Sequence, residues 1–303
     1  MIAMRIATDE VQLMCHTIAL MRKIVILASL VTAFAFSAGA QVSEGDQHWN
    51  ARAEGHQGGR AKPAQIEAAI AAYQKAVAQE PNNLEARWKL LRAIRFKGAY
   101  VASAGEEKKR VYAFGKKEGD AAIAIVNRDL AAKGVKADAH EKQIAEAART
   151  INGAGEVFFW DSVNWGEWAL AYGKMAAVRE GAADRIRREA TIAMLCDPKM
   201  DGGGPQRVLG RLHDETPHVP FLTGWASSSE AVRFLKESYR IDPTNKITRV
   251  FLADAMVSND SKSGPEAIRI LREVINTPND PNYEVENSQA QEDAKALLRE
   301  WGG

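Results

Sequence analysis

Apolar residues recur at intervals of three and four residues along most of the chain, which is the pattern of amphipathic helices. The first such stripe begins after Pro63 and ends before Pro81, with its apolar positions at Ile66, Ala69, Ile70, Tyr73, Ala76 and Val77. Similar stripes predict a helix over residues 84–96, a pair of charged helices over 106–133 and a helix over about 137–151. The alternation with a period of two that is typical of strands is missing, so we predict an all-α fold.

A spacing motif repeats within these stripes. The second helix of a tetratricopeptide repeat has the order small-x3-bulky-x2-small-x4-Pro, because small residues let paired helices approach closely and proline cannot continue a helix. Four segments fit this order, beginning at Ala69, Ile186, Ala231 and Ala267, the last with its proline one place early. We therefore predict a tetratricopeptide-like array of helical hairpins, an α-solenoid with helical insertions, as a single domain over residues 63–300.

The N-terminal region has the features of an export signal. A short basic start at residues 21–23, an apolar run over 24–36 and small residues up to Ala40 occur in the order of a secretory signal peptide. We predict that residues 21–40 are this signal, that cleavage falls between Ala40 and Gln41, and that the product is periplasmic. Residues 1–20 are interpreted as an extension wrongly assigned upstream of the true start, and 41–62 as a loosely held polar lead-in.

Composition adds little to this picture. The chain has 40 Lys and Arg against 39 Asp and Glu, a balance that gives no reason to expect nucleic acid or an anionic membrane as a partner. A basic run that we interpret as a solvated helix face consists of Lys108, Lys109, Arg110, Lys116 and Lys117. No segment after residue 40 is apolar enough to span a bilayer, so no stable membrane insertion is predicted. A homo-oligomer is compatible with the sequence.

An aromatic segment is the strongest candidate for a binding site. Phe158, Trp165 and Tyr172 recur every seven residues and share one side of a predicted helix. Such a stripe is typical of a helix core, but four large aromatics exceed what hairpin packing needs, so a ligand slot or partner groove stays open. The side chains that would line it are Phe158, Asp161, Asn164, Trp165, Trp168 and Tyr172.

Other candidate sites are weaker. A glycine run at residues 202–204, followed by Pro205 and Arg207, could hold an anion at a helix N-terminus. It lacks the Lys-Ser or Lys-Thr pair of a P-loop, so a tight turn that starts a helix is the better interpretation. His213, Asp214, Glu215 and His218 could form a metal cluster, but the two histidines are five residues apart with Pro217 between them, which is wrong for ligands on one helix face, so we interpret the segment as a solvated loop. We find no G-x-S-x-G setting and no distinct carboxylate pair, so neither an enzyme nor a cofactor nor a metal site is predicted.

Two segments carry a resemblance to a known family. Residues 155–169 include Gly-Glu-Val-Phe-Phe-Trp and Asn-Trp-Gly-Glu-Trp-Ala, and residues 202–212 read Gly-Gly-Gly-Pro-Gln-Arg-Val-Leu-Gly-Arg-Leu. This order resembles the T-component family of TRAP transporters, in which a Trp-rich helix precedes a GGP-x-R-x-LG turn between cryptic tetratricopeptide repeats. The resemblance implies a periplasmic helical protein that partners a TRAP-type substrate-binding protein and handles an organic, apolar ligand. The cysteine of a lipoprotein signal is missing, so no lipid anchor is expected.

Two functions follow as hypotheses. The first is a non-enzymatic accessory component that associates with a TRAP-type substrate-binding protein and binds a small apolar or organic-acid ligand. The second is a general tetratricopeptide scaffold for protein–protein interaction in the bacterial envelope. An enclosed apolar cavity beside Trp165 and Trp168 would favour the first hypothesis, and an open groove lined by Asn, Lys and Arg would favour the second.

Overall fold

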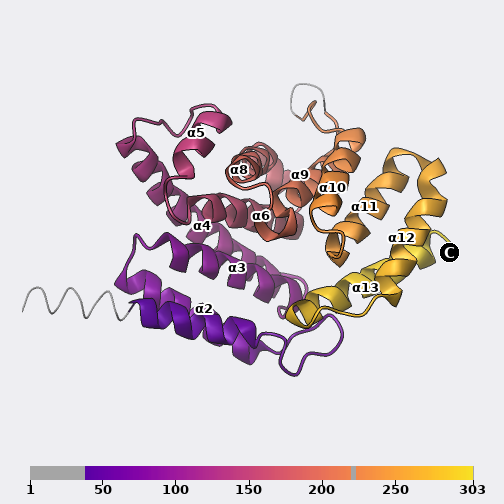
Figure 1. Ribbon diagram of the computed structural model, residues 1–303, viewed down its shortest axis with the longest axis horizontal. Helices are drawn as coiled ribbons and strands as arrows, with labels where there is room; N and C mark the ends of the chain where they lie inside the picture. The colour runs from indigo at the N-terminus through magenta and orange to yellow at the C-terminus, as the bar shows by residue number, and fades with distance from the viewer. Residues whose placement is uncertain (1–37, 220–222, 303) are drawn as a thin grey trace, which may run out of the picture.

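The computed structural model describes residues 38–219 and 223–302, and these residues form helices joined by short connections (Figure 1). A helix covers residues 38–50, and the elements after it are α2 Pro63–Gln79, α3 Leu84–Tyr100, α4 Glu106–Ala132, α5 Glu141–Ala148, α6 Ala154–Tyr172, α7 Lys174–Arg179, α8 Ala182–Cys196, α9 Gly204–Glu215, α10 Ser228–Ile241, α11 Lys246–Asn259, α12 Gly264–Asn276 and α13 Glu284–Glu300. An isolated bridge between Gln57 and Arg60 is the one β-type pairing in these ranges. The prediction of an all-α fold is confirmed.

The ends of the helices follow from local sequence. Pro63 occupies the first turn of α2, where its missing N–H costs nothing, and the helix ends at Gln79 before Pro81. Asn83 caps α3, because its side-chain oxygen accepts a hydrogen bond from the backbone N–H of Ala86 at 3.0 Å. No described helix has the length and apolarity that a bilayer crossing requires.

The spacing motif found in the sequence coincides with buried positions. Its small and bulky residues lie on α2, α8, α10 and α12, and each is 4% exposed or less. These positions are Ala69, Tyr73, Ala76, Ile186, Ala190, Ala193, Ala231, Leu235, Ser238, Ala267, Leu271 and Val274. From α8 to α13 each helix packs against the next in the chain, and α2 packs in the same way against α3. These helices are therefore packed in sequential pairs.

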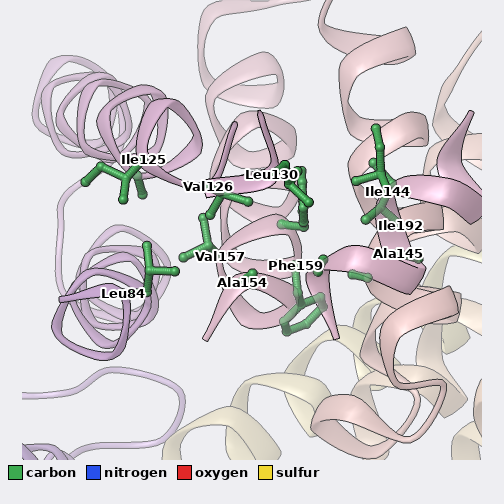
Figure 2. Close-up of a cluster of buried hydrophobic side chains, with 14 of the residues drawn as sticks. Leu84, Ile125, Val126, Leu130, Ile144, Ala145, Ala154, Val157, Phe159 and Ile192 are labelled. Atoms are coloured by element: carbon green, nitrogen blue, oxygen red, sulfur yellow. The ribbon is translucent and has the colours of Figure 1, made fainter. Parts of the chain in front are cut away.

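Between the first pair and this C-terminal run lies a larger group of helices. Residues 106–132, predicted as two charged helices, are one helix of 27 residues, α4. Gly115 and Gly119 do not interrupt it, because α6 packs against the space they leave. Figure 2 shows side chains of α3, α4 and α6, among them Leu84, Val126 and Val157, converging in the main core, with α5 and α8 completing it.

The prediction of a loosely held lead-in at 41–62 is wrong in its first part. Val42 is buried against Ala76, and the edge of Trp49 meets the ring of Phe96 at 5.7 Å between centroids. The guanidinium of Arg52 forms a buried ion pair with Glu286 of α13 at 2.8 Å. This segment therefore joins the two ends of the described chain, and α13 lies beside the N-terminal helices in Figure 1. The predicted extension at 1–20 and the predicted signal up to residue 37 lie outside the described residues.

Candidate functional site

The aromatic residues predicted as a ligand slot lie on α6, but they belong to two separate clusters. Phe158 belongs to the main core with α3, α4 and α5, whereas Trp165 and Trp168 belong to a second cluster with Tyr112 of α4 and residues of α8. Phe158, Trp165 and Trp168 are 4%, 3% and 7% exposed, and Tyr172 is 40% exposed. The aromatic residues therefore serve different packing surfaces of a helix that has neighbours on several sides.

The rings of the second cluster are stacked and covered by cations. Trp165 and Trp168 meet edge to face at 5.6 Å, and Trp168 stacks on Tyr172 at 4.8 Å. The Lys116 ammonium lies 4.4 Å from the Trp165 ring centroid, and the Arg185 guanidinium lies 4.5 Å from it. A cation this close to an aromatic ring is attracted by the negative potential of the ring face. The cluster is thus filled by the protein's own side chains.

The two polar residues of the predicted slot are also internal. Asn164 is fully buried, and its amide nitrogen donates to the carbonyl oxygens of Leu91 at 3.1 Å and Trp160 at 2.8 Å. Its oxygen faces α4 at Gly115, where a Cβ atom would lie 2.3 Å away. Asn164 therefore joins α6 to α3 and α4, and it takes no part in an open site.

Asp161 lies one turn earlier and belongs to a buried charged cluster. Arg185 of α8 donates to Asp161 at 2.6 Å and to Glu189 at 3.0 Å, and it also pairs with Asp120 of α4 at 2.7 Å. Burial raises the pKa of Asp161, although hydrogen bonding to its neighbours opposes this. Burial, and then the Asp161 carboxylate, raise the pKa of Glu189 well above its usual value. One guanidinium faces three carboxyls here, so the neutral form of Glu189 is favoured.

The glycine run forms the predicted turn into a helix. Gly202 and Gly203 have φ angles of +61° and +78°, which favour glycine, and α9 begins at Gly204 with Pro205 in its first turn. Arg207 pairs with Asp201 at 2.6 Å and donates to the hydroxyl of Thr248 at 3.2 Å. Its charge is therefore neutralised within the fold, and the anion interpretation has no support here.

The candidate metal ligands are also accounted for by packing. His213 is buried in α9, stacked against Phe234, and accepts a hydrogen bond from the backbone N–H of Ser227 at 3.2 Å. Burial lowers the pKa of this imidazole. The interpretation as a solvated loop is wrong for His213, which is a core residue. Among the described residues no group of three or more His, Cys, Asp or Glu side chains is placed to hold a metal ion.

A cavity of about 310 Å³ lies between the N-terminal helices and the C-terminal helices. The elements around it are α3, α4, α6, α11 and α13, together with the segment before α2. Its lining residues are Arg60, Arg95, Ala99, Tyr100, Lys108, Glu167, Ile247, Val250, Phe251, Glu286, Gln289, Ala290 and Asp293. Pockets for small molecules measure about 300–1,000 Å³, so the volume of this cavity lies at the lower limit of that range.

Charges line this cavity unevenly. Arg95 donates to Glu167 at 3.1 Å and to the Tyr100 hydroxyl at 3.0 Å, so this cation is already paired. Glu286 is likewise paired with Arg52 of the lead-in. Arg60 and Lys108 remain as cations, with the Arg60 guanidinium donating to the carbonyl oxygens of Val101 and Ala102, and Asp293 remains as a carboxylate. The lining thus has three cations and three carboxyls, and setting the paired groups aside leaves one positive charge beside an apolar wall from α11.

Sequence reasoning missed this cavity. Of the lining residues only Lys108 had been noticed, as part of a basic run, and only Glu167 comes from the aromatic helix. Residues 60 and 293 are separated by most of the chain, so no local pattern could have placed them together. No family model matches the chain, and no curated protein matches it.

Proposed function

We propose that the protein is a non-enzymatic periplasmic binding protein that associates, as an accessory T component, with a TRAP-type substrate-binding protein. We further propose that this protein binds a small organic acid. The cavity carries the ligand part of this proposal. A carboxylate entering it meets Arg60 and Lys108, while an apolar body faces Val250 and Phe251 of α11. A wholly apolar ligand is less suitable, because it would desolvate these cations without compensation.

The transport part of the proposal rests on sequence resemblance and on packing. The two segments at 155–169 and 202–212 are similar to those of the T-component family. The first lies in α6 and most of the second in α9, and α6 packs against both α8 and α9. A tetratricopeptide-like solenoid is supported by the burial of its motif positions and by the sequential pairing of helices from α8 to α13. The predicted signal peptide supports export to the periplasm.

The ligand assignment can be tested by thermal unfolding and by calorimetric titration with a panel of mono- and dicarboxylic acids. Replacing one cation of a charge-assisted hydrogen bond costs about 1.5–3 kcal/mol, so Arg60→Gln and Lys108→Gln are each expected to weaken binding about 10- to 150-fold. Lys236→Gln, on the exposed face of α10, is the matched control and should leave affinity unchanged. If no acid binds at millimolar concentration, or if the two cavity variants bind as the parent does, the ligand assignment is refuted.

Co-purification tests the partner. A TRAP-type substrate-binding protein should be retained by this protein when both are isolated from the expressing bacterium, and the acid identified above should change that retention. The charged lining also favours the second candidate, a scaffold that binds an envelope protein, because Lys and Arg form charge-assisted hydrogen bonds with carboxylates such as a peptide C-terminus. Binding of a peptide with a free C-terminus, in the absence of any binding by small acids, would support the scaffold and contradict the transport proposal.

A further inference from the structure

Exposed apolar side chains are concentrated at one corner of the molecule, where α6 turns into α7. Leu170, Met175 and Val178 are 62%, 69% and 64% exposed, and Tyr172 is 40% exposed. These four residues lie within nine positions of the chain, and we refer to them as the α6–α7 patch. Scattered exposed apolar residues are ordinary on protein surfaces, but a cluster of large ones indicates an interaction site.

The outward face of α7 is amphipathic along its length. Ala176 and Ala177 pack inward against the second aromatic cluster, whereas Met175 and Val178 are exposed. Lys174 and Arg179, also exposed, flank these two apolar residues on the same outward face. A row of apolar side chains between cations is the arrangement of helices that lie in a membrane interface, where long basic side chains reach the headgroups.

The neighbouring part of α4 adds further positive charge. The Lys109 ammonium lies 5.9 Å from the centre of the Tyr172 ring, and Lys116 pairs with Glu180 at the end of α7 at 3.4 Å. Residues 109–116 of α4 therefore run alongside the patch from one end to the other. Over residues 106–120 and 170–180 the net charge is +2: the carboxylates are Glu106, Glu107, Glu118, Asp120 and Glu180, and the cations are Lys108, Lys109, Arg110, Lys116, Lys117, Lys174 and Arg179. The balanced net charge of the whole chain hides this local excess.

We propose that the α6–α7 patch binds peripherally to an anionic lipid bilayer, with Leu170, Tyr172, Met175 and Val178 entering the headgroup region and the surrounding cations contacting lipid phosphates. Anionic lipid complements both properties of the surface, since apolar burial and attraction to negative headgroups add together in interfacial binding. Apart from Lys108, which lines the cavity, the residues of this surface are separate from the cavity, and the proposal does not depend on the ligand proposed for it.

Vesicle co-sedimentation tests the proposal, with the protein purified from expressing cells in the form that the cell makes. Vesicles containing phosphatidylglycerol should bind it at least about tenfold more tightly than vesicles of phosphatidylcholine, and added salt should weaken the binding because it screens exposed charges. The double variant Met175→Ser/Val178→Ser and the double variant Lys174→Gln/Arg179→Gln should each lose about tenfold or more in affinity for the anionic vesicles. All the replaced side chains are exposed, so melting temperatures should not change.

Two control variants make the result specific. Tyr239→Ser removes an exposed apolar ring from α10, and Lys236→Gln removes an exposed cation from the same helix. Both should bind vesicles as the parent does. Equal binding by the parent and the patch variants would overturn the proposal. So would an absence of vesicle binding together with a patch-dependent association with an acidic protein, because the occupant would then be a protein and not a bilayer.

Discussion

Replacement of Gly119 by alanine tests how tightly α4 and α6 are joined. A Cβ atom at this position would lie 1.7 Å from Oδ1 of Asp161, whereas ordinary contacts begin at 3.4 Å. The carboxylate would have to retreat by about the difference, and this would displace its other oxygen, Oδ2, from the 2.6 Å hydrogen bond that Arg185 donates to it. The variant Gly119→Ala should therefore disrupt a buried ion pair as well as crowd the interface.

The magnitude follows from two opposing effects. Alanine is favoured over glycine inside a helix by about 1 kcal/mol. Breaking a buried ion pair costs about 3–5 kcal/mol. The expected net loss in the free energy of unfolding is about 2–4 kcal/mol, measured by urea denaturation followed by helical circular dichroism.

A matched glycine on the partner helix provides the control. Gly166 lies within α6, and a Cβ atom there meets nothing within 4 Å, so Gly166→Ala should be neutral or stabilise by up to about 1 kcal/mol. A double-mutant cycle tests whether the loss comes from the contact with Asp161. In the background Asp161→Ala, the loss of unfolding free energy caused by Gly119→Ala should fall below about 1 kcal/mol. A neutral Gly119→Ala, or an equal cost in both backgrounds, would refute the reasoning.

Two further predictions concern the buried carboxyls and the repeat motif. Because the folded-state pKa of Glu189 is raised, the parent loses stability as pH rises above 4.5, the ordinary pKa of a glutamate. The side chain of Glu189→Gln is neutral throughout, so this variant should gain stability relative to the parent as pH rises above that value, measured by urea unfolding. Identical pH slopes would contradict this. Leu235→Ala should cost about 2–5 kcal/mol, whereas Lys236→Ala on the exposed face of α10 should stay within about 0.5 kcal/mol, so similar losses in both would show that the motif register is wrong.

The helices that could be predicted from sequence are those whose signals are local. The stripe that begins after Pro63 predicts α2, because the spacing of apolar residues and the prolines at its ends lie within one short segment. The charged stretch 106–133 was predicted as a pair of helices, whereas residues 106–132 form the single helix α4, which contains Gly115 and Gly119. Its glycines are retained for a reason that sequence does not show, namely the side chains of Asn164 and Asp161 that pack against them.

The lead-in was misjudged for a related reason. Its composition is polar and contains glycine, which is typical of a loosely held segment. Arg52 is nevertheless buried, because its partner Glu286 lies 234 positions along the chain and the Trp49 ring covers it at 4.4 Å. The spacing of Trp49 and Arg52, three residues apart, is a local sign that the arginine packs on the ring. The sequence around them gives no sign of which carboxylate pairs with Arg52.

The candidate site lay beyond sequence reasoning in a more basic way. An excess of aromatic residues on α6 was interpreted as a surplus over packing needs, on the assumption that the helix is half of a simple hairpin. In the structure α6 packs against α3, α4, α8 and α9, so several faces need large side chains and the surplus disappears. The cavity instead arises where α13 and the lead-in bring the two ends of the chain together, with Arg60 and Lys108 from one end and Asp293 from the other. The residues that line such a cavity carry no shared sequence pattern, because no single helix contains them.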